Sequence, residues 1–407
     1  MDHRLIGAVE KALGWFGPGE MGKAFARGCM PDPELCARLL TPTKLLDLMM
    51  RRSLAPPQLR CFQRGTDLHP NAYLTATTNR RGQTIQMANM NRLARLMQMG
   101  CTLVLDTVDT FDPTMEVVCR ALQWWSREFV HVNTYLTTQS TTGFDLHWDD
   151  HDVVIVQLAG EKDWEVRGRS RPVPMYRDAA FNPTPSEEVI WSGTLVTGDV
   201  MHIPRGYWHQ ATRNGHSEGF SLHVTFGFCR RTGVDWLTWV ADRSREDELF
   251  RHDLDLWGSP DEWSTQEEEL ATAASRLVAS RSPSDFLTAR ECEQPPHRQV
   301  STFGIFGAPT AVVCVTEFSP RLEQHGETVD VLDAEKKITF AARAVPVLYR
   351  LLSGQPVGLA ETTAATGVDA MILANVLVTE GICADLTPEL LSGYTGLAMN
   401  GDFLKER

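Results

Sequence analysis

The pattern of apolar and polar positions divides the chain into a helical beginning, a β-rich middle and a helical end. Apolar residues within 1–60 recur mostly at helical spacing, and TPTKLLDLMMRR (41–52) begins with a capping Thr41 and carries a broad apolar face. A helix over 90–100 is expected to end at Gly100. A strand at 101–108 and a helix at 113–129 are expected to follow.

The spacing changes at residue 130. From 130 to 230 short β-type runs alternate with glycine and proline turns, a texture typical of a sandwich or barrel. Residues 235–290 are expected to be helical, and 295–320 to form a linker and a strand. Residues 335–400 read as three glycine-ended helices with a wing, which resembles a helix-turn-helix unit: KITFAARAVPVLYRLLSG, LAETTAATG and VDAMILANVLVTEG.

Length and composition narrow the class of protein. A chain of 407 residues predicts two to three domains. It has no apolar run of about 18 residues, so no transmembrane helix and no membrane partner are expected. The first residues, which include Glu10 and Lys11, are expected to form a helix rather than a signal peptide. The nine scattered cysteines form no CxxC pair, which favours a reduced, cytoplasmic protein.

The net charge of −13, from 52 acidic and 39 basic residues, argues against a general affinity for nucleic acid. Much of this charge lies between Asp242 and Leu270, where eleven residues are acidic and three are basic. The expected recognition helix, 369–380, has two acidic residues and no lysine or arginine. We therefore expect no direct nucleic-acid binding and read the C-terminal unit as a protein-interaction or structural module.

The chemistry is concentrated in TTGFDLHWDDHDVVIVQLAGEKDWEV (141–166). His147 and Asp149 are two residues apart, so on an extended strand their side chains leave the same face. GDVMHIPRGYWH (198–209) supplies His209 after a tight turn, and a closed barrel can bring these strands together. Two histidines and one carboxylate form the facial triad of non-haem Fe(II) oxygenases, although zinc hydrolases use similar ligands.

Two alternatives remain open from the residues alone. Other histidines compete for the ligand role, among which His202 alternates with apolar neighbours as a core residue does: His151, His202, His216 and His223. Lys162 follows an expected turn at 159–160, and if buried it needs an anionic partner such as the distal carboxylate of 2-oxoglutarate. Otherwise it is a solvated lysine at a hairpin end.

The segment HWDDHDVVIVQLAGEKDW resembles the iron-binding segment of the JmjC-type ribosomal oxygenases, the cupin 4 family of 2-oxoglutarate-dependent hydroxylases. CTLVLDTV and VNTYLTT upstream, and GDVMHIPRGYWHQA and SLHVTFG downstream, stand in the order this family shows. The resemblance covers roughly 30–400. It implies an α+β fold: a double-stranded β-helix (cupin/JmjC jelly-roll) barrel with N-terminal helices, a helical dimerisation region and a C-terminal winged helix.

The resemblance also implies roles for individual residues. Fe(II) would be bound by His147, Asp149 and His209, and the C5 carboxylate of 2-oxoglutarate by Lys162. The remaining implied contacts are with cosubstrate and substrate, namely Asn133, Tyr135 and, near the target side chain, Ser221. The implied activity is a dioxygenase that uses O₂ and 2-oxoglutarate to hydroxylate an amino-acid side chain of a protein or peptide.

Some residues depart from the family pattern. Thr138 stands where the family usually has proline, and the acidic Glu161 and Asp163 flank Lys162. These departures leave room for a tailoring hydroxylase of a peptide natural product or carrier-bound amino acid. A non-catalytic, metal-binding cupin scaffold is a third reading.

The expected domains are a catalytic domain with N-terminal helices (1–235), a helical dimerisation region (236–300) and a winged-helix domain (301–407). Apolar residues that could anchor a partner helix in a homodimer are Trp236, Trp239, Val240, Leu249, Phe250, Leu254, Leu256 and Trp257. An intrachain helical pair would use the same residues.

Overall fold

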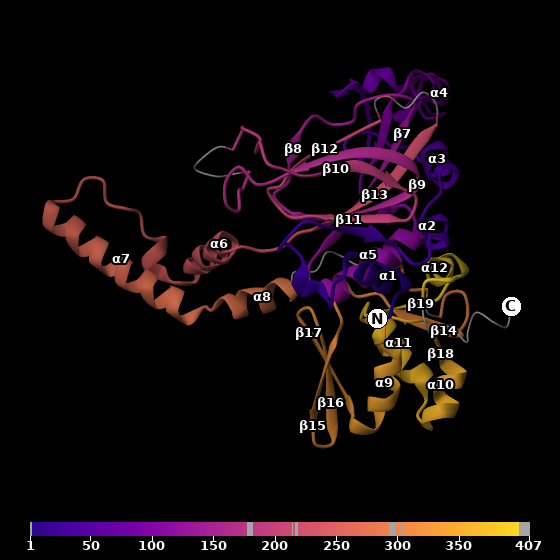
Figure 1. Ribbon diagram of the computed structural model, residues 1–407. Helices are drawn as coiled ribbons and strands as arrows, with labels where there is room; N and C mark the ends of the chain where they lie inside the picture. Colours follow the sequence, from indigo (N-terminus) through magenta and orange to yellow (C-terminus); the bar gives the residue numbers. More distant parts are fainter. Residues whose placement is uncertain are drawn as a thin grey trace. The chain divides into compact units, whose positions relative to one another are not determined.

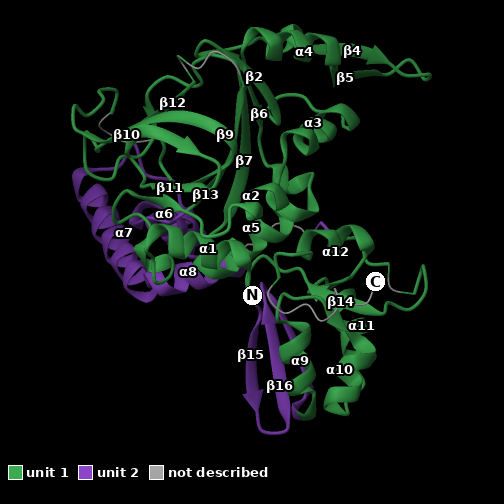
Figure 2. Ribbon diagram, turned by 45° about the vertical axis from the view of Figure 1, so that its right-hand side comes forward, with its two compact units in different colours: residues 1–229, 299–319, 343–407 green, residues 230–298, 320–342 purple. Residues whose placement is uncertain are grey.

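The structure is a computed structural model, shown in Figure 1, and describes residues 2–176, 182–213, 215, 219–292, 298–302 and 304–398. Its contacts divide the chain into two compact units (Figure 2). The first unit comprises 1–229, 299–319 and 343–407, and the second comprises 230–298 and 320–342. Among the described residues, no helix is both long and apolar enough to span a bilayer.

The N-terminal part of the first unit is mainly helical, as predicted. Its helices are α1 (Arg4–Leu13), α2 (Glu34–Leu39), α3 (Pro42–Arg51), α4 (Met90–Met99) and α5 (Pro113–Ser126). The Thr41 hydroxyl accepts the backbone N–H of Lys44, which confirms the predicted cap of α3. Gly100 ends α4 with a φ of 88°, a conformation that favours glycine.

The β-type runs predicted within 130–230 form strands of an antiparallel sheet, which confirms that this segment is β-rich. The strands of the sheet are β1 (Ala26–Cys29), β2 (Leu59–Gln63), β3 (Thr66–Asp67), β6 (Thr102–Leu105), β7 (Val130–Thr138), β8 (His147–Trp148), β9 (Asp152–Arg167), β10 (Val189–Val196), β11 (Asp199–Ile203), β12 (Trp208–Thr212) and β13 (Phe220–Phe228). The main path runs β1-β11-β9-β13-β7-β6-β2-β3, while β10 and β12 pair with β9, and β8 pairs with β12. A separate hairpin joins β4 (Leu74–Thr78) to β5 (Thr84–Ala88).

Strand β9 takes part in two sets of pairings. Its first half pairs with β11 and β13, and its second half pairs with β10 and β12. The expected reversal at 159–160 is wrong, because β9 continues through Gly160, whose φ is +66°. The register against β13 shifts by one residue beside this point, as in a β-bulge. The bulge changes the alternation, so that Ile155 before it and Lys162 after it line the same cavity.

The main core lies between the sheet and the N-terminal helices. Apolar residues of α1, α2, α3 and α5 join those of β6, β7, β9 and β13 in one cluster. Leu45, Leu103, Val132, Val156 and Leu222 in this cluster are fully buried. This packing stabilises the strands that carry the chemistry, because burial of apolar side chains is the main favourable contribution to folding.

The rest of the first unit contains the three helices predicted near the C-terminus. Its elements are β14 (Ala311–Cys314), α9 (Val345–Leu351), β18 (Val357–Gly358), α10 (Leu359–Thr366), α11 (Ala370–Thr379), β19 (Cys383–Asp385) and α12 (Pro388–Tyr394), with the strands in the order β18-β14-β19. Val313 and Tyr394 pack with Val117 of α5 in a second buried cluster. The C-terminal elements therefore share a core with the helix that precedes β7.

The second unit is mainly helical over 233–292, as predicted. Its helices are α6 (Gly233–Arg243), α7 (Pro260–Ser280) and α8 (Pro283–Cys292). It also contains an unexpected three-stranded sheet of β15 (Arg321–His325), β16 (Thr328–Asp333) and β17 (Lys336–Ala341). The prediction that KITFAA begins a helix is wrong, because Ile338 and Phe340 alternate with exposed neighbours as in a half-buried strand.

Candidate metal centre

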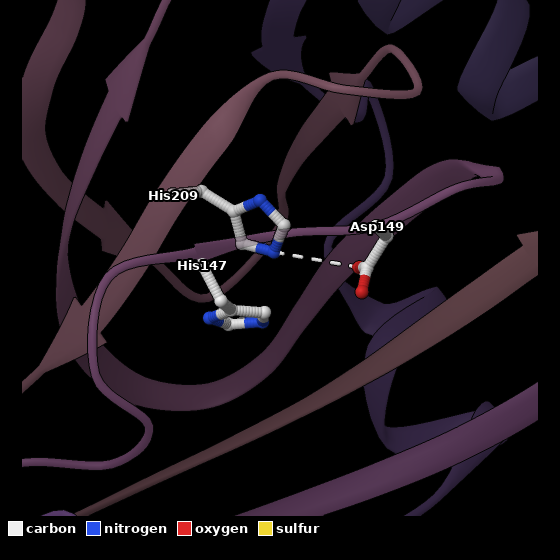
Figure 3. Close-up of side chains that lie close together, drawn as sticks. All are labelled: His147, Asp149 and His209. Atoms are coloured by element: carbon white, nitrogen blue, oxygen red, sulfur yellow. Dashed lines mark ion pairs between the residues drawn. The ribbon is translucent and has the colours of Figure 1, made fainter. Parts of the chain in front are cut away.

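Three side chains that sequence analysis singled out lie together in the first unit (Figure 3). His209 of β12 is paired directly opposite His147 of β8, and Asp149 follows one residue beyond the end of β8. One possible ligand atom from each residue lies within 4.8 Å of the others. The Nε2 atom of His209 lies 3.5 Å from Oδ2 of Asp149, and the two imidazole rings are 4.4 Å apart.

Backbone carbonyls orient both imidazoles. Nδ1 of His147 lies 2.7 Å from the carbonyl oxygen of Asp145, and Nδ1 of His209 lies 3.1 Å from that of Tyr207. A carbonyl can only accept, so each Nδ1 carries a proton, and in the neutral form of each ring Nε2 has the lone pair. Metal-bound histidines usually have this arrangement, so the three residues fit a divalent cation.

The surroundings of the cluster also favour a neutral His209 and an ionised Asp149. Burial, together with the neighbouring His147, lowers the pKa of His209 to about 4. Burial opposes ionisation of Asp149, but the nearby His209, His151 and His147 bring the pKa of this carboxyl below its usual value. At neutral pH the site therefore offers a neutral imidazole and a carboxylate, the protonation states that metal binding requires.

The cluster lines a cavity of about 270 Å³. The cavity also contains Lys162, Asn133 and Tyr135, so the structure brings together the predicted site residues except Ser221. The full lining is Arg60, Thr102, His131, Asn133, Tyr135, Gly143, Phe144, His147, Asp149, His151, Val153, Ile155, Lys162, Trp164, His209, Ala211, His223 and Thr225.

Lys162 is buried in the wall of this cavity, with 1% of its surface exposed. The reading as a solvated lysine is therefore wrong. Its Nζ donates to the Thr137 hydroxyl at 2.6 Å, and the Thr137 and Thr102 hydroxyls are 3.0 Å apart. Burial, with a smaller effect of Arg213, lowers the pKa of Lys162 to about 7. A buried ammonium with hydroxyl neighbours is suited to binding a carboxylate.

The other predicted contact residues lie on neighbouring strands. Asn133 accepts the backbone N–H of Thr107 through Oδ1 at 3.0 Å, and the Tyr135 ring stacks on His223 at 4.7 Å. Ser221 is fully buried, and its hydroxyl accepts the Gln157 amide at 2.9 Å. It does not line the cavity.

The competing histidines have different surroundings. His202 is fully buried, its Nε2 accepts the Gly22 N–H, and its Nδ1 lies 3.0 Å from the Val153 carbonyl oxygen. Both ring nitrogens are thus occupied, which makes it a core histidine rather than a ligand. His151 and His223 line the cavity but are not in the ligand cluster, and His216 lies outside the described residues.

Sequence analysis missed several residues of the site. Thr137 continues the alternating row of Asn133 and Tyr135 on β7, so the period of two could have identified it. Trp164 could have been found two residues after Lys162 in the same way. Arg60 comes from a distant strand, and no local pattern indicates it.

Antiparallel strands around a cavity with two histidines, a carboxylate and a buried lysine define a cupin-type fold with a candidate metal centre. Comparison with known families gives the narrower class, because residues 108–234 match the family described as JmjC domain. The matched segment includes the ligand cluster and Lys162.

Curated proteins that are similar in sequence to this chain are named as a demethylase and hydroxylase or as an oxygenase. The chain is 28% identical over 212 residues to the bifunctional lysine-specific demethylase and histidyl-hydroxylase NO66 of Brugia malayi, covering 50% of this chain and 28% of that protein. It is 33% identical over 137 residues to ribosomal oxygenase 1 of Gallus gallus, covering 33% of this chain and 22% of that protein. The chain thus spans less than a third of the length of either relative.

Solved structures support the fold over a greater length. The ribosomal oxygenase YcfD of Escherichia coli, in complex with cobalt and 2-oxoglutarate, aligns with a TM-score of 0.53 and 16% identity. The alignment covers 91% of this chain and 98% of that chain. At this identity the likeness establishes a JmjC/cupin fold of mostly antiparallel strands with helices.

Proposed function

We propose that the protein is an Fe(II)- and 2-oxoglutarate-dependent dioxygenase that hydroxylates an amino-acid side chain of a protein or peptide. The observation that carries the proposal is the cluster of His147, Asp149 and His209, with both Nε2 atoms available, in one cavity with a buried lysine. The names of the curated relatives and the bound groups of the Escherichia coli neighbour agree with it.

The three side chains would hold Fe(II) on one face and leave three coordination positions open. A bound iron would supply oxygen activation: one atom of O₂ would enter a C–H bond of the target, the other would enter succinate, and 2-oxoglutarate would lose CO₂. The protein orients the ligands through the carbonyls of Asp145 and Tyr207. Preset ligand geometry keeps the open positions accessible to cosubstrate and O₂.

Lys162 would bind the C5 carboxylate of 2-oxoglutarate. Its ammonium is almost fully buried, and Thr137 beside it offers a hydroxyl. A carboxylate at this point would neutralise the buried charge, which otherwise lacks water to solvate it. Asn133 and Tyr135 also line the cavity and would contact the cosubstrate and the target side chain.

The other parts of the chain have proposed roles. The strands are proposed to form a double-stranded β-helix barrel in a catalytic domain over 1–235, followed by a dimerisation region at 236–300 and a winged helix within 301–407. Trp236 donates to the Arg281 carbonyl within its own chain, whereas Leu254, Leu256 and Trp257 are at least 72% exposed and could meet a second copy. The nine cysteines, which form no CxxC pair in the sequence, agree with a cytoplasmic location.

The test is mass spectrometry of candidate protein and peptide substrates incubated with Fe(II), O₂ and 2-oxoglutarate. We expect one substrate to gain the mass of one oxygen atom, with stoichiometric succinate. Omission of 2-oxoglutarate, or His147→Ala, should abolish both products. Equal product formation by the His147→Ala variant would contradict the proposal.

A further inference from the structure

The two strands that carry the histidines of the cluster are also held from their other face. Trp148 follows His147, Trp208 precedes His209, and the two tryptophans are directly paired between β8 and β12. Side chains alternate along a strand, so both indoles point away from the imidazoles. Each indole N–H is a donor that needs a partner when buried.

Both indoles find that partner in the connection between β9 and β10. Trp148 Nε1 donates to the Asn182 carbonyl at 3.1 Å, and Trp208 Nε1 donates to the Ser170 hydroxyl at 2.9 Å. The Ser170 hydroxyl in turn donates to Oδ1 of Asn182 at 2.7 Å. Two points of the connection are thus fixed to the ligand strands and to each other.

A third point of the same connection reaches a ligand of the cluster directly. The Tyr176 hydroxyl shares its one proton between two acceptors, the Trp148 carbonyl at 2.9 Å and Oδ1 of Asp149 at 3.3 Å. The Tyr176 ring packs on the Trp148 ring at 4.8 Å. The other carboxylate oxygen, Oδ2 of Asp149, is the one that faces His209 Nε2. The two oxygens of Asp149 therefore have different surroundings.

We propose that Tyr176 is a positioning residue for the metal site: its hydroxyl holds Oδ1 of Asp149, so that Oδ2 alone is presented to the metal. This inference rests on the proposed function, because it takes the cluster to bind Fe(II). A carboxylate held through one oxygen cannot rotate to bind with both, which keeps a further position open. Hydrogen-bond partners of metal ligands typically change metal affinity by about 10- to 100-fold.

The test compares two variants of the full chain in anaerobic titrations with Co(II) alone. Tyr176→Phe keeps the ring on Trp148 and removes the hydroxyl, whereas Tyr176→Ala removes both. We expect each variant to weaken Co(II) binding by about 10-fold, since the lost group is the same. The control, Tyr349→Phe, changes an exposed tyrosine and should bind like the unaltered protein. Tyr176 is 58% exposed and Tyr176→Phe keeps its ring on Trp148, so we expect the melting temperature of this apo variant to stay unchanged.

Two results would overturn the proposal. One is a Tyr176→Phe variant whose Co(II) affinity lies within about twofold of the unaltered protein, well under the expected effect. The other is a loss confined to Tyr176→Ala, which would assign the effect to ring packing. A His147→Ala variant separates this failure from that of the proposed function. If His147→Ala abolishes Co(II) binding while Tyr176→Phe does not weaken it, only the Tyr176 proposal fails; if His147→Ala still binds Co(II) normally, both fail.

Discussion

Replacing Lys162 with methionine should change folding stability and cosubstrate affinity in opposite directions. Methionine keeps the length of the side chain and removes its charge. A pKa lowered from its ordinary 10.5 to about 7 corresponds to about 5 kcal/mol of unfavourable free energy for holding the ammonium in this buried position. The variant avoids this cost, and Thr137 keeps its contact with Thr102. We therefore expect the apo variant to be at least as stable as the unaltered protein.

The affinity for 2-oxoglutarate should fall sharply in the same variant. Removing one partner of a buried ion pair leaves the other charge uncompensated, which costs about 3–5 kcal/mol, or roughly 100- to 4000-fold in binding. Calorimetric titration of 2-oxoglutarate into metal-loaded protein measures the binding, and urea denaturation measures the stability. Lys23→Met, which changes an exposed lysine, is the control. Lys162→Met protein that binds 2-oxoglutarate normally would refute the reasoning.

Three further outcomes are expected. A carboxylate binds the charged form of Lys162, whose pKa is about 7 in the free protein, so 2-oxoglutarate affinity should fall as the pH rises above about 7. Calorimetry in buffers of different ionisation enthalpy should detect proton uptake on binding, and no uptake would contradict the assignment. His202→Ala should reduce the free energy of unfolding by about 2–3 kcal/mol through two lost buried hydrogen bonds while leaving Co(II) affinity intact, and a loss of Co(II) binding would count against its core role. Arg120→Met removes a buried ion pair with Glu116 at 2.5 Å and a hydrogen bond to Tyr394 of α12. Urea denaturation should therefore show a free energy of unfolding lower by about 3 kcal/mol. An unchanged midpoint would mean that this contact does not stabilise the C-terminal elements.

The proximity of His147 and His209 could be predicted from the sequence, because each residue lies in a clear local pattern. The HxD spacing, the tight turn before His209 and the surrounding β-type alternation all predict strands that converge. The directly opposed register of the two histidines then depends on long-range pairing, which the sequence does not encode locally.

The course of β9 through Gly160 could not be predicted from the sequence. Gly160 reads as a turn, whereas the structure uses it inside one long strand with a bulge. A bulge and a turn share the same residue preferences, so only the partner strand distinguishes them. For that reason the burial of Lys162 could not be predicted, although the need of a buried Lys162 for an anionic partner could.

The contact of Tyr176 with Asp149 was also beyond local patterns. Tyr176 lies in a connection between strands, where no hydrophobic period fixes the position of a side chain. The sheet of β15–β17 was missed for another reason, because its two outer strands, β15 and β17, are short and mostly exposed. Weak alternation of this kind is easily read as helix.

The most direct test of the central claim uses the protein without any target substrate. Fe(II)-loaded protein should be mixed anaerobically with 2-oxoglutarate and its visible spectrum recorded, before O₂ is admitted and succinate is measured. If His147, Asp149 and His209 hold Fe(II) with positions open for the cosubstrate, a weak charge-transfer band appears, and both band and succinate are absent from His147→Ala and Asp149→Ala proteins. A folded, iron-loaded protein that shows no band, or variants that retain it, would contradict the account.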